Sequence, residues 1–86
     1  MKTINVLTEK QKEYLRLMAL GYSDKAICKM KYIAQGTLNG YRARIYNALE
    51  IFAKAEKISP RVLASIQYWQ ENIDEFKEIN LNDIHY

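Results

Sequence analysis

The chain contains very few of the residues that build disulfides or metal centres. Cys28 is the only cysteine and His85 the only histidine among 86 residues. One cysteine excludes an internal disulfide, and one cysteine with one histidine excludes the four-ligand spacings of structural zinc sites. We therefore expect no metal and no cofactor, and we interpret Cys28 as a small packed side chain rather than a reactive thiol.

Helix-breaking residues and long apolar runs are also scarce. The sequence has one proline and three glycines, while apolar residues make up 49% of it, a balance typical of a compact all-α domain. No run approaches the roughly eighteen apolar residues of a membrane-spanning helix, and no secretory signal pattern opens the chain. We expect no membrane partner and a cytoplasmic location.

Groups suited to catalysis are nearly absent. The single histidine lies in the terminal tail, no carboxylate pair falls on a predicted apolar face, and no glycine-rich phosphate loop follows a strand. Acidic residues recur at near-helical spacing in Glu71, Asp74, Glu75 and Glu78, which is typical of a solvated helix face. We do not expect an enzyme.

Charge is distributed unevenly along the chain. Residues 1–57 contain eleven Lys and Arg against five Asp and Glu, whereas residues 58–86 contain two against five. A basic front half, net +6, suits a nucleic-acid partner, and an acidic remainder, net −3, suits a solubilising or partner-facing segment. An ordinary solvated surface would have the same totals, so charge alone leaves both interpretations open.

Capping signals place the first two helices. Thr8 and Gln11 have the spacing of a capping box, and Gly21 is placed to end the first helix with a positive φ. The apolar stripe of this helix is Tyr14, Leu15, Leu17, Met18 and Ala19. Ser23 is predicted to cap a short second helix ending near Met30, with Ala26, Ile27 and Met30 facing inward.

A third helix is predicted to begin near Ala34 or Gln35, and its helical wheel separates two faces. The inward arc holds Leu38, Tyr41, Ile45, Leu49 and Phe52, and the opposite face holds Gly36, Asn39, Gly40, Ala43 and Asn47. Arg42 and Arg44 flank the small-residue face, which would let the helix backbone approach a DNA groove. The alternative is that Gly36, Gly40 and Ala43 form a close helix-packing seam. Each glycine makes helix formation about 1 kcal/mol less favourable than alanine would, so a functional or packing role is needed to explain the two glycines.

The remainder predicts a long fourth helix. No glycine or proline lies between Tyr41 and Ser59, so the third helix is expected to run through Ala53 or beyond. Ser59 and Pro60 have the N-cap and N1 order that starts a helix. Its apolar stripe is longer than one small core needs, so we expect Ile66, Trp69, Ile73 and Phe76 to form a homodimer interface or to meet the N-terminal arm.

These elements form one predicted domain spanning residues 1–86. Residues 1–6 are an extended arm, 7–57 a helix-turn-helix core, 58–78 the C-terminal helix and 79–86 a tail.

Residues along the first half resemble the LuxR/GerE type of helix-turn-helix transcription factor. The matching positions are Leu7, Thr8, Leu15, Ala19, Gly21, Ser23, Lys25, Ile27, Ile33, Thr37, Leu38, Ile45 and Leu49. The resemblance covers about half of the chain and implies a four-helix fold whose third helix reads DNA and whose fourth forms a homodimer. The stretch from Gly36 through Leu49 is also similar to region 4 of bacterial sigma factors.

The resemblance assigns roles to single residues. Lys25 and Thr37 match positions that touch the DNA backbone, and Asn39, Gly40 and Ala43 match positions that face base edges. The chain departs from the family pattern at Lys31, Ala34, Asn39, Tyr41 and Ala48, and the change at Asn39 removes a basic side chain from the reading face.

Two functions follow from these patterns. In the first, a bacterial or phage transcriptional regulator binds double-stranded DNA as a homodimer through Lys25, Gln35, Thr37, Asn39, Gly40, Arg42, Ala43, Arg44 and Asn47. Gln35, Asn39 and Asn47 would read bases with a preference for adenine, while Lys25, Thr37, Arg42 and Arg44 hold phosphates. In the second, the same fold is a protein-interaction module that acts on polymerase or another regulator through its acidic C-terminal helix.

Overall fold

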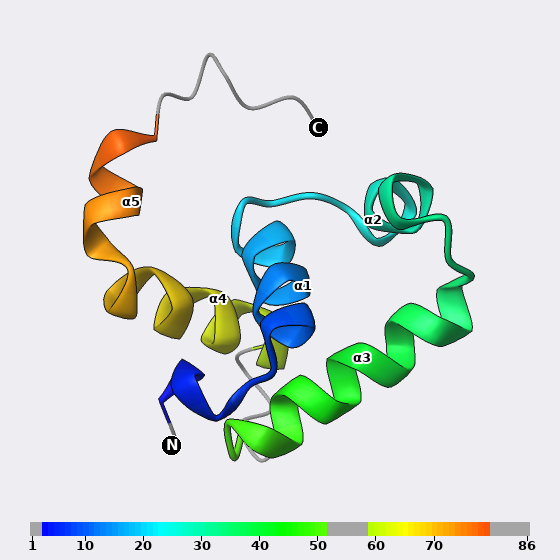
Figure 1. Ribbon diagram of the computed structural model, residues 1–86, viewed down its shortest axis with the longest axis horizontal. Coiled ribbons are helices and arrows are strands. Elements are labelled where there is room, and N and C mark those ends of the chain that lie inside the picture. Colours follow the sequence, from blue (N-terminus) through cyan, green and yellow to red (C-terminus); the bar gives the residue numbers. More distant parts are fainter. Residues whose placement is uncertain (1–2, 52–58, 80–86) are drawn as a thin grey trace.

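The computed structural model describes residues 3–51 and 59–79, and within these ranges the chain is all-helical, with no strand. The elements in order are the 3-10 turn η1 (Ile4–Val6), α1 (Glu9–Ala19), α2 (Asp24–Lys31), α3 (Gln35–Ala48), α4 (Pro60–Glu71) and α5 (Ile73–Glu78). Helix α1 lies in the middle and contacts α3 on one side and α4 on the other (Figure 1). No helix in this part of the chain combines the length and apolar character needed to cross a bilayer.

The predicted helix starts are confirmed, because each depends on chemistry within a few residues. Thr8 accepts from the amide of Gln11 at 3.1 Å, and the Gln11 side chain accepts from the amide of Thr8 at 3.0 Å, which completes the capping box. The hydroxyl oxygens of Ser23 and Ser59 accept amides at the starts of α2 and α4, and Pro60 opens α4. Local sequence therefore sets where these helices begin.

Three helix ends share one geometry. Gly21, Tyr32 and Glu50 have φ angles of 93°, 54° and 58°, and the amide after each donates to a carbonyl five residues earlier, at 3.2, 3.1 and 2.8 Å. This is the hydrogen bond of a Schellman motif. The positive φ predicted at Gly21 is confirmed.

The predicted extension of the third helix through Ala53 is wrong. Helix α3 ends at Ala48 because Glu50 turns left-handed and the Ile51 amide bonds back to Tyr46. Burial of Ile51, which is 5% exposed, supplies the apolar contact that accompanies this motif. Phe52, predicted to be inward, lies outside the described residues.

The hydrophobic core is packed around α1. Its buried residues are Ile4, Leu7, Tyr14, Leu15, Met18, Ile27, Leu38, Ile45, Leu49, Ile51, Ala64 and Tyr68. The predicted inward positions Leu38, Ile45 and Leu49 are fully buried, and Tyr41 stacks on Tyr14 with ring centroids 4.5 Å apart. Met30, predicted to be inward, is 43% exposed, because Ile27 is the only residue that α2 buries.

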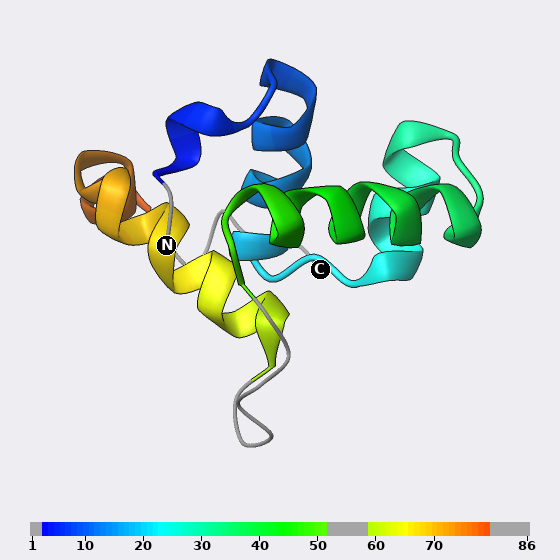
Figure 2. The same cartoon turned by 90° about the horizontal axis from the view of Figure 1, so that it is seen from below.

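The N-terminal arm is not extended where the structure describes it. Residues Ile4–Val6 form a 3-10 turn, and Ile4 packs into the core. The amide of Ile4 donates to both carboxylate oxygens of Glu71, at 3.1 and 3.2 Å. The arm therefore meets α4 at Glu71, whereas the stripe residues Ile66, Ile73 and Phe76, for which the arm was one of two predicted partners, stay about half exposed. Figure 2 shows the turn beside α4.

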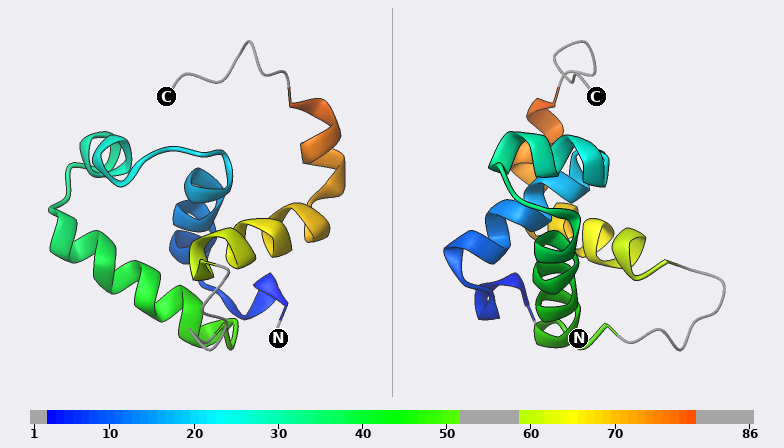
Figure 3. Two further views of the ribbon diagram at one scale, coloured as in Figure 1. Left: turned by 180° about the vertical axis from the view of Figure 1, so that it is seen from behind. Right: turned by 90° about the vertical axis from the view of Figure 1, so that its right-hand side faces the viewer.

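The predicted continuous helix over residues 58–78 is wrong, because the chain bends at Asn72. The Asn72 side chain donates to the carbonyl of Tyr68 at 2.8 Å, which takes the acceptor that the Asn72 amide would use in a continuing helix. That amide bonds to Trp69 instead, at 3.2 Å, and α5 starts at the next residue. Figure 3 shows α5 turned away from α4, at the opposite end of the molecule from α2.

Candidate nucleic-acid interface

Helix α3 has one buried face and one open face. Opposite the buried leucines and isoleucine, the residues Gly36, Asn39, Ala43 and Asn47 are exposed. A Cβ atom built on Gly36 or Gly40 would meet nothing within 4 Å. The interpretation of these glycines as a packing seam is therefore wrong within the described chain.

Helices α2 and α3 are joined by a short turn. The connection is Tyr32, Ile33 and Ala34, and the left-handed φ of Tyr32 reverses the chain within it. Figure 1 shows α2 end-on while α3 lies across the view, so the two helices cross steeply. Their contact brings the start of α2 next to the first turns of α3.

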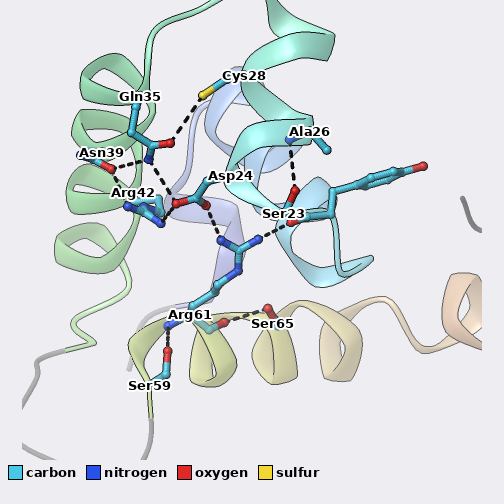
Figure 4. A network of polar contacts seen from close by, with 11 residues as sticks. Ser23, Asp24, Ala26, Cys28, Gln35, Asn39, Arg42, Ser59, Arg61 and Ser65 are labelled. Carbon is cyan, nitrogen blue, oxygen red and sulfur yellow. Dashed lines mark hydrogen bonds and ion pairs between the residues drawn. The ribbon is translucent and has the colours of Figure 1, made fainter. Parts of the chain in front are cut away.

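The carboxylate of Asp24 is the centre of a polar network that joins three helices (Figure 4). Its Oδ2 accepts from Arg42 Nη1 at 2.6 Å and from Gln35 Nε2 at 3.1 Å, and its Oδ1 accepts from Arg61 Nη1 at 2.5 Å. Arg61 also donates to the carbonyl of Tyr22. One acidic residue thus fixes the start of α2 against both α3 and α4.

Partial burial alone would raise the pKa of Asp24, but the hydrogen bonds from Arg61 and Gln35, together with the charge of Arg42, hold this pKa below its usual value. A carboxyl group whose pKa is lowered by folding stabilises the fold above its unfolded pKa, near 4. That contribution is lost as the pH falls through the folded pKa. The network is therefore intact at neutral pH.

Three of the residues predicted to contact DNA, Gln35, Asn39 and Arg42, are hydrogen-bonded to one another. Asn39 Oδ1 accepts from Gln35 Nε2 at 2.9 Å and from Arg42 Nη2 at 2.5 Å. Arg42, predicted as a free phosphate ligand, is instead paired with Asp24 and only 24% exposed along its side chain. The sequence did not indicate the contacts of Asp24 with Arg42 and Arg61, because these pairs are 18 and 37 residues apart and no local pattern predicts such contacts.

The remaining predicted contacts stay open to solvent. Lys25 and Arg44 are exposed and have no ion-pair or hydrogen-bond partner within residues 3–51 and 59–79. Thr37 is exposed in the first turn of α3. Lys29, which was not among the predicted contacts, is also an exposed cation on α2. Both α2 and α3, the two helices joined at Asp24, therefore carry exposed cations.

The predicted dimer residues are on a different surface. Ile66, Ile73 and Phe76 are 49%, 47% and 52% exposed, while the Trp69 indole donates to the carbonyl of Ala19 at 2.9 Å. These four residues and Gln70 line one apolar pocket of about 310 Å³. The structure thus brings the four together around one concavity between α4 and α5.

Two further findings bear on the site. No group of three or more His, Cys, Asp or Glu side chains within the described residues could hold a metal ion. Comparison with protein-family models, with curated proteins and with solved structures gives no match for this chain.

Proposed function

We propose that this protein is a small transcriptional regulator that inserts α3 into the major groove of double-stranded DNA. The observation that carries the proposal is the open face of α3, where nothing lies over Gly36 and Gly40, while Leu38, Ile45 and Leu49 on the opposite side are fully buried. A helix surface without bulk can come close to base edges in a groove about 12 Å wide. The exposed cations Lys25 and Arg44 are the proposed phosphate ligands beside it.

The arrangement of α2 and α3 supports the proposal. Two short helices that cross steeply after a three-residue connection are typical of a helix-turn-helix, in which the second helix enters the groove. The resemblance of residues 7–49 to LuxR/GerE domains points to the same helix. Asp24 fixes α2 against α3, so the pair would meet DNA as a preformed unit.

The proposed assembly is a homodimer formed through α4 and α5. The apolar pocket lined by Ile66, Trp69, Ile73 and Phe76 offers a surface that a second copy can bury. A two-fold dimer would place its two α3 helices on half-sites about one helical turn apart.

The proposal is tested by the salt dependence of DNA binding. Replacing Lys25 and Arg44 together with glutamine removes two proposed phosphate ligands per chain. The slope of log affinity against log salt should therefore become shallower by about 0.9 for each phosphate that is no longer neutralised. Fluorescence anisotropy with a labelled duplex measures this slope.

The matched control is Lys77→Gln, because Lys77 is an exposed cation on α5, at the other end of the molecule. Its slope should equal that of the wild type. Failure of the wild type to bind any duplex at low salt, or an equal effect of Lys77→Gln, contradicts the proposal.

The second candidate function is a protein-interaction module derived from the same fold. It is favoured by the engagement of Gln35, Asn39 and Arg42 inside the chain, which leaves fewer groups for bases. Absence of DNA binding, together with binding to purified RNA polymerase that Phe76→Glu abolishes, would select this function.

A further inference from the structure

The polar network fixes which way each amide on α3 points. The Asp24 carboxylate can only accept, so the Gln35 atom facing it must be Nε2. The Arg42 guanidinium can only donate, so the Asn39 atom facing it must be Oδ1. A flip of either amide would set two donors or two acceptors against each other. The orientations therefore follow from the chemistry of their neighbours.

These orientations leave each amide with one kind of group to offer. Gln35 Nε2 has two hydrogens, and it donates to both Asp24 and Asn39. Asn39 Oδ1 has two lone pairs, and it accepts from both Gln35 and Arg42. What remains is the Nδ2 amino group of Asn39, which is donor only, and Oε1 of Gln35, which is acceptor only and lies 3.9 Å from the Cys28 sulfur.

The base edges of the major groove distinguish between such groups. Adenine is recognised by an amide that donates to N7 and accepts from N6 at the same time, whereas guanine presents two acceptors, N7 and O6. An Asn39 whose oxygen is fully used cannot accept from N6, and a Gln35 whose nitrogen is fully used cannot donate to N7. The adenine preference expected from the presence of amides therefore does not hold for these two residues.

We propose that Asn39 is a donor-only reader that prefers guanine to adenine, and that Arg42 is the positioning residue that sets this preference by occupying the Asn39 oxygen. This inference rests on the proposed function, because it specifies what the open face of α3 reads. Arg42 acts on specificity through Asn39, in addition to its ion pair with Asp24.

A pair of arginine variants separates this role from the loss of charge. Arg42→Met keeps an apolar stem, frees one lone pair on Asn39 and leaves Asp24 paired with Arg61. Arg44→Met removes the same charge from the same helix at an exposed position that does not contact Asn39. Both variants should lose affinity, and only Arg42→Met should change base preference, by about tenfold from guanine toward adenine.

The experiment selects bound duplexes from a random pool with the wild type, both arginine variants and Asn39→Ala. The position whose preference disappears in Asn39→Ala is the one that Asn39 reads. Guanine there in the wild type and in Arg44→Met, with adenine gained in Arg42→Met, is the expected result. Adenine in the wild type, or an equal shift in both arginine variants, overturns the inference while the proposed function stands. Absence of any selected sequence, with no binding at low salt, overturns both.

A measurement on the free protein tests the network without DNA. The side-chain amide protons of Gln35 are both hydrogen-bonded, so they should exchange with solvent more slowly than those of Asn39, and Arg42→Met should shift the Asn39 resonances more than Arg44→Met does. Equal exchange rates for the side-chain amide protons of Gln35 and Asn39 would overturn the inference, independently of the DNA-binding results.

Discussion

The outward faces of α3 and of the α4–α5 pair are both open to solvent, yet they differ in chemistry. The α3 face consists of glycine, alanine and asparagine, with unpaired cations beside it. The α4–α5 face exposes Ile66, Ile73 and Phe76 around an apolar pocket. Apart from Trp69, which packs against the core, these residues lie outside it, and α3 and α4 bury their opposite sides while α5 buries no residue.

This difference indicates what each face can bind. Exposed apolar area gains about 25 cal/mol per Å² when a partner covers it, so the α4–α5 face favours another apolar surface. The α3 face has little apolar area to cover, and its small residues and nearby positive charge favour a polyanion that comes close to the backbone. The proposed dimer and the proposed DNA contact therefore use separate surfaces.

The largest expected effect comes from placing charge on the apolar face. Ile66→Glu combined with Phe76→Glu should convert the proposed dimer into a monomer. Association should weaken by about a hundredfold or more, because each symmetric copy gives up two apolar side chains whose full burial is worth roughly 1.5–3 kcal/mol each. Sedimentation equilibrium measures the change. Val62→Glu is the control, since Val62 is also 49% exposed but does not line the pocket. A wild type that stays monomeric at high concentration contradicts the dimer.

Substitution of the glycines tests the α3 face with a smaller effect. Gly40→Ala should raise the free energy of unfolding by about 1 kcal/mol, because alanine is the better helix former and a Cβ there meets nothing. Gly21→Ala should lower it by about 1 kcal/mol or more, because the φ of Gly21 is 93°. Urea denaturation measures both. Destabilisation by Gly40→Ala would show that the face is covered in solution.

The smallest expected effect concerns the hydrogen bond between Tyr68 of α4 and Glu75 of α5, which joins the two helices across the bend at Asn72. Burial, together with the hydrogen bond to Glu75 at 3.1 Å, raises the pKa of Tyr68 to about 12. A tyrosine whose pKa is raised by folding stabilises the fold below its unfolded pKa, near 10, and that contribution disappears as the pH rises from 10 to about 12.

An ultraviolet titration should therefore contain a tyrosine that ionises near pH 12 and that disappears in Tyr68→Phe. Burial also raises the pKa of Tyr46, so the comparison with Tyr68→Phe is what assigns the signal. Glu75→Gln should lower the pKa of Tyr68 only part of the way, since burial is the larger cause. A titration of Tyr68 at its ordinary pKa would mean that α5 does not hold the position described.

Features determined by neighbouring residues could be predicted from the sequence. The caps at Thr8, Ser23 and Ser59 and the left-handed Gly21 depend on side chains and φ preferences within one helical turn. The buried face of α3 followed from helical periodicity, because one side of the wheel holds all its large apolar residues. These features position the open face, so its composition was also predictable.

Features set by distant contacts or by unusual backbone angles could not be predicted. Tyr32 and Glu50 have left-handed φ angles although neither is glycine, so their residue types do not predict a helix end. The helical periodicity of the apolar residues continues through Asn72, so the sequence does not indicate that the Asn72 side chain donates to the carbonyl of Tyr68 and ends the helix. The partnership of Asp24 with Arg42 and Arg61 requires the folded arrangement of three helices, and it changes what Asn39 can offer.

The hydrogen bonds between the Ile4 amide and Glu71 join residues 67 positions apart in the sequence. A one-turn 3-10 helix has no stability of its own, so its amides would exchange rapidly in an incomplete fold. Protection of this single backbone proton therefore reports that the first turn has docked on the end of α4. A fusion or deletion that displaces Ile4 would remove both hydrogen bonds and leave the Glu71 carboxylate with the Gln67 side-chain amide, which donates to it at 2.9 Å. The change would fall just before the Asn72 bend, far from the mutated segment in sequence.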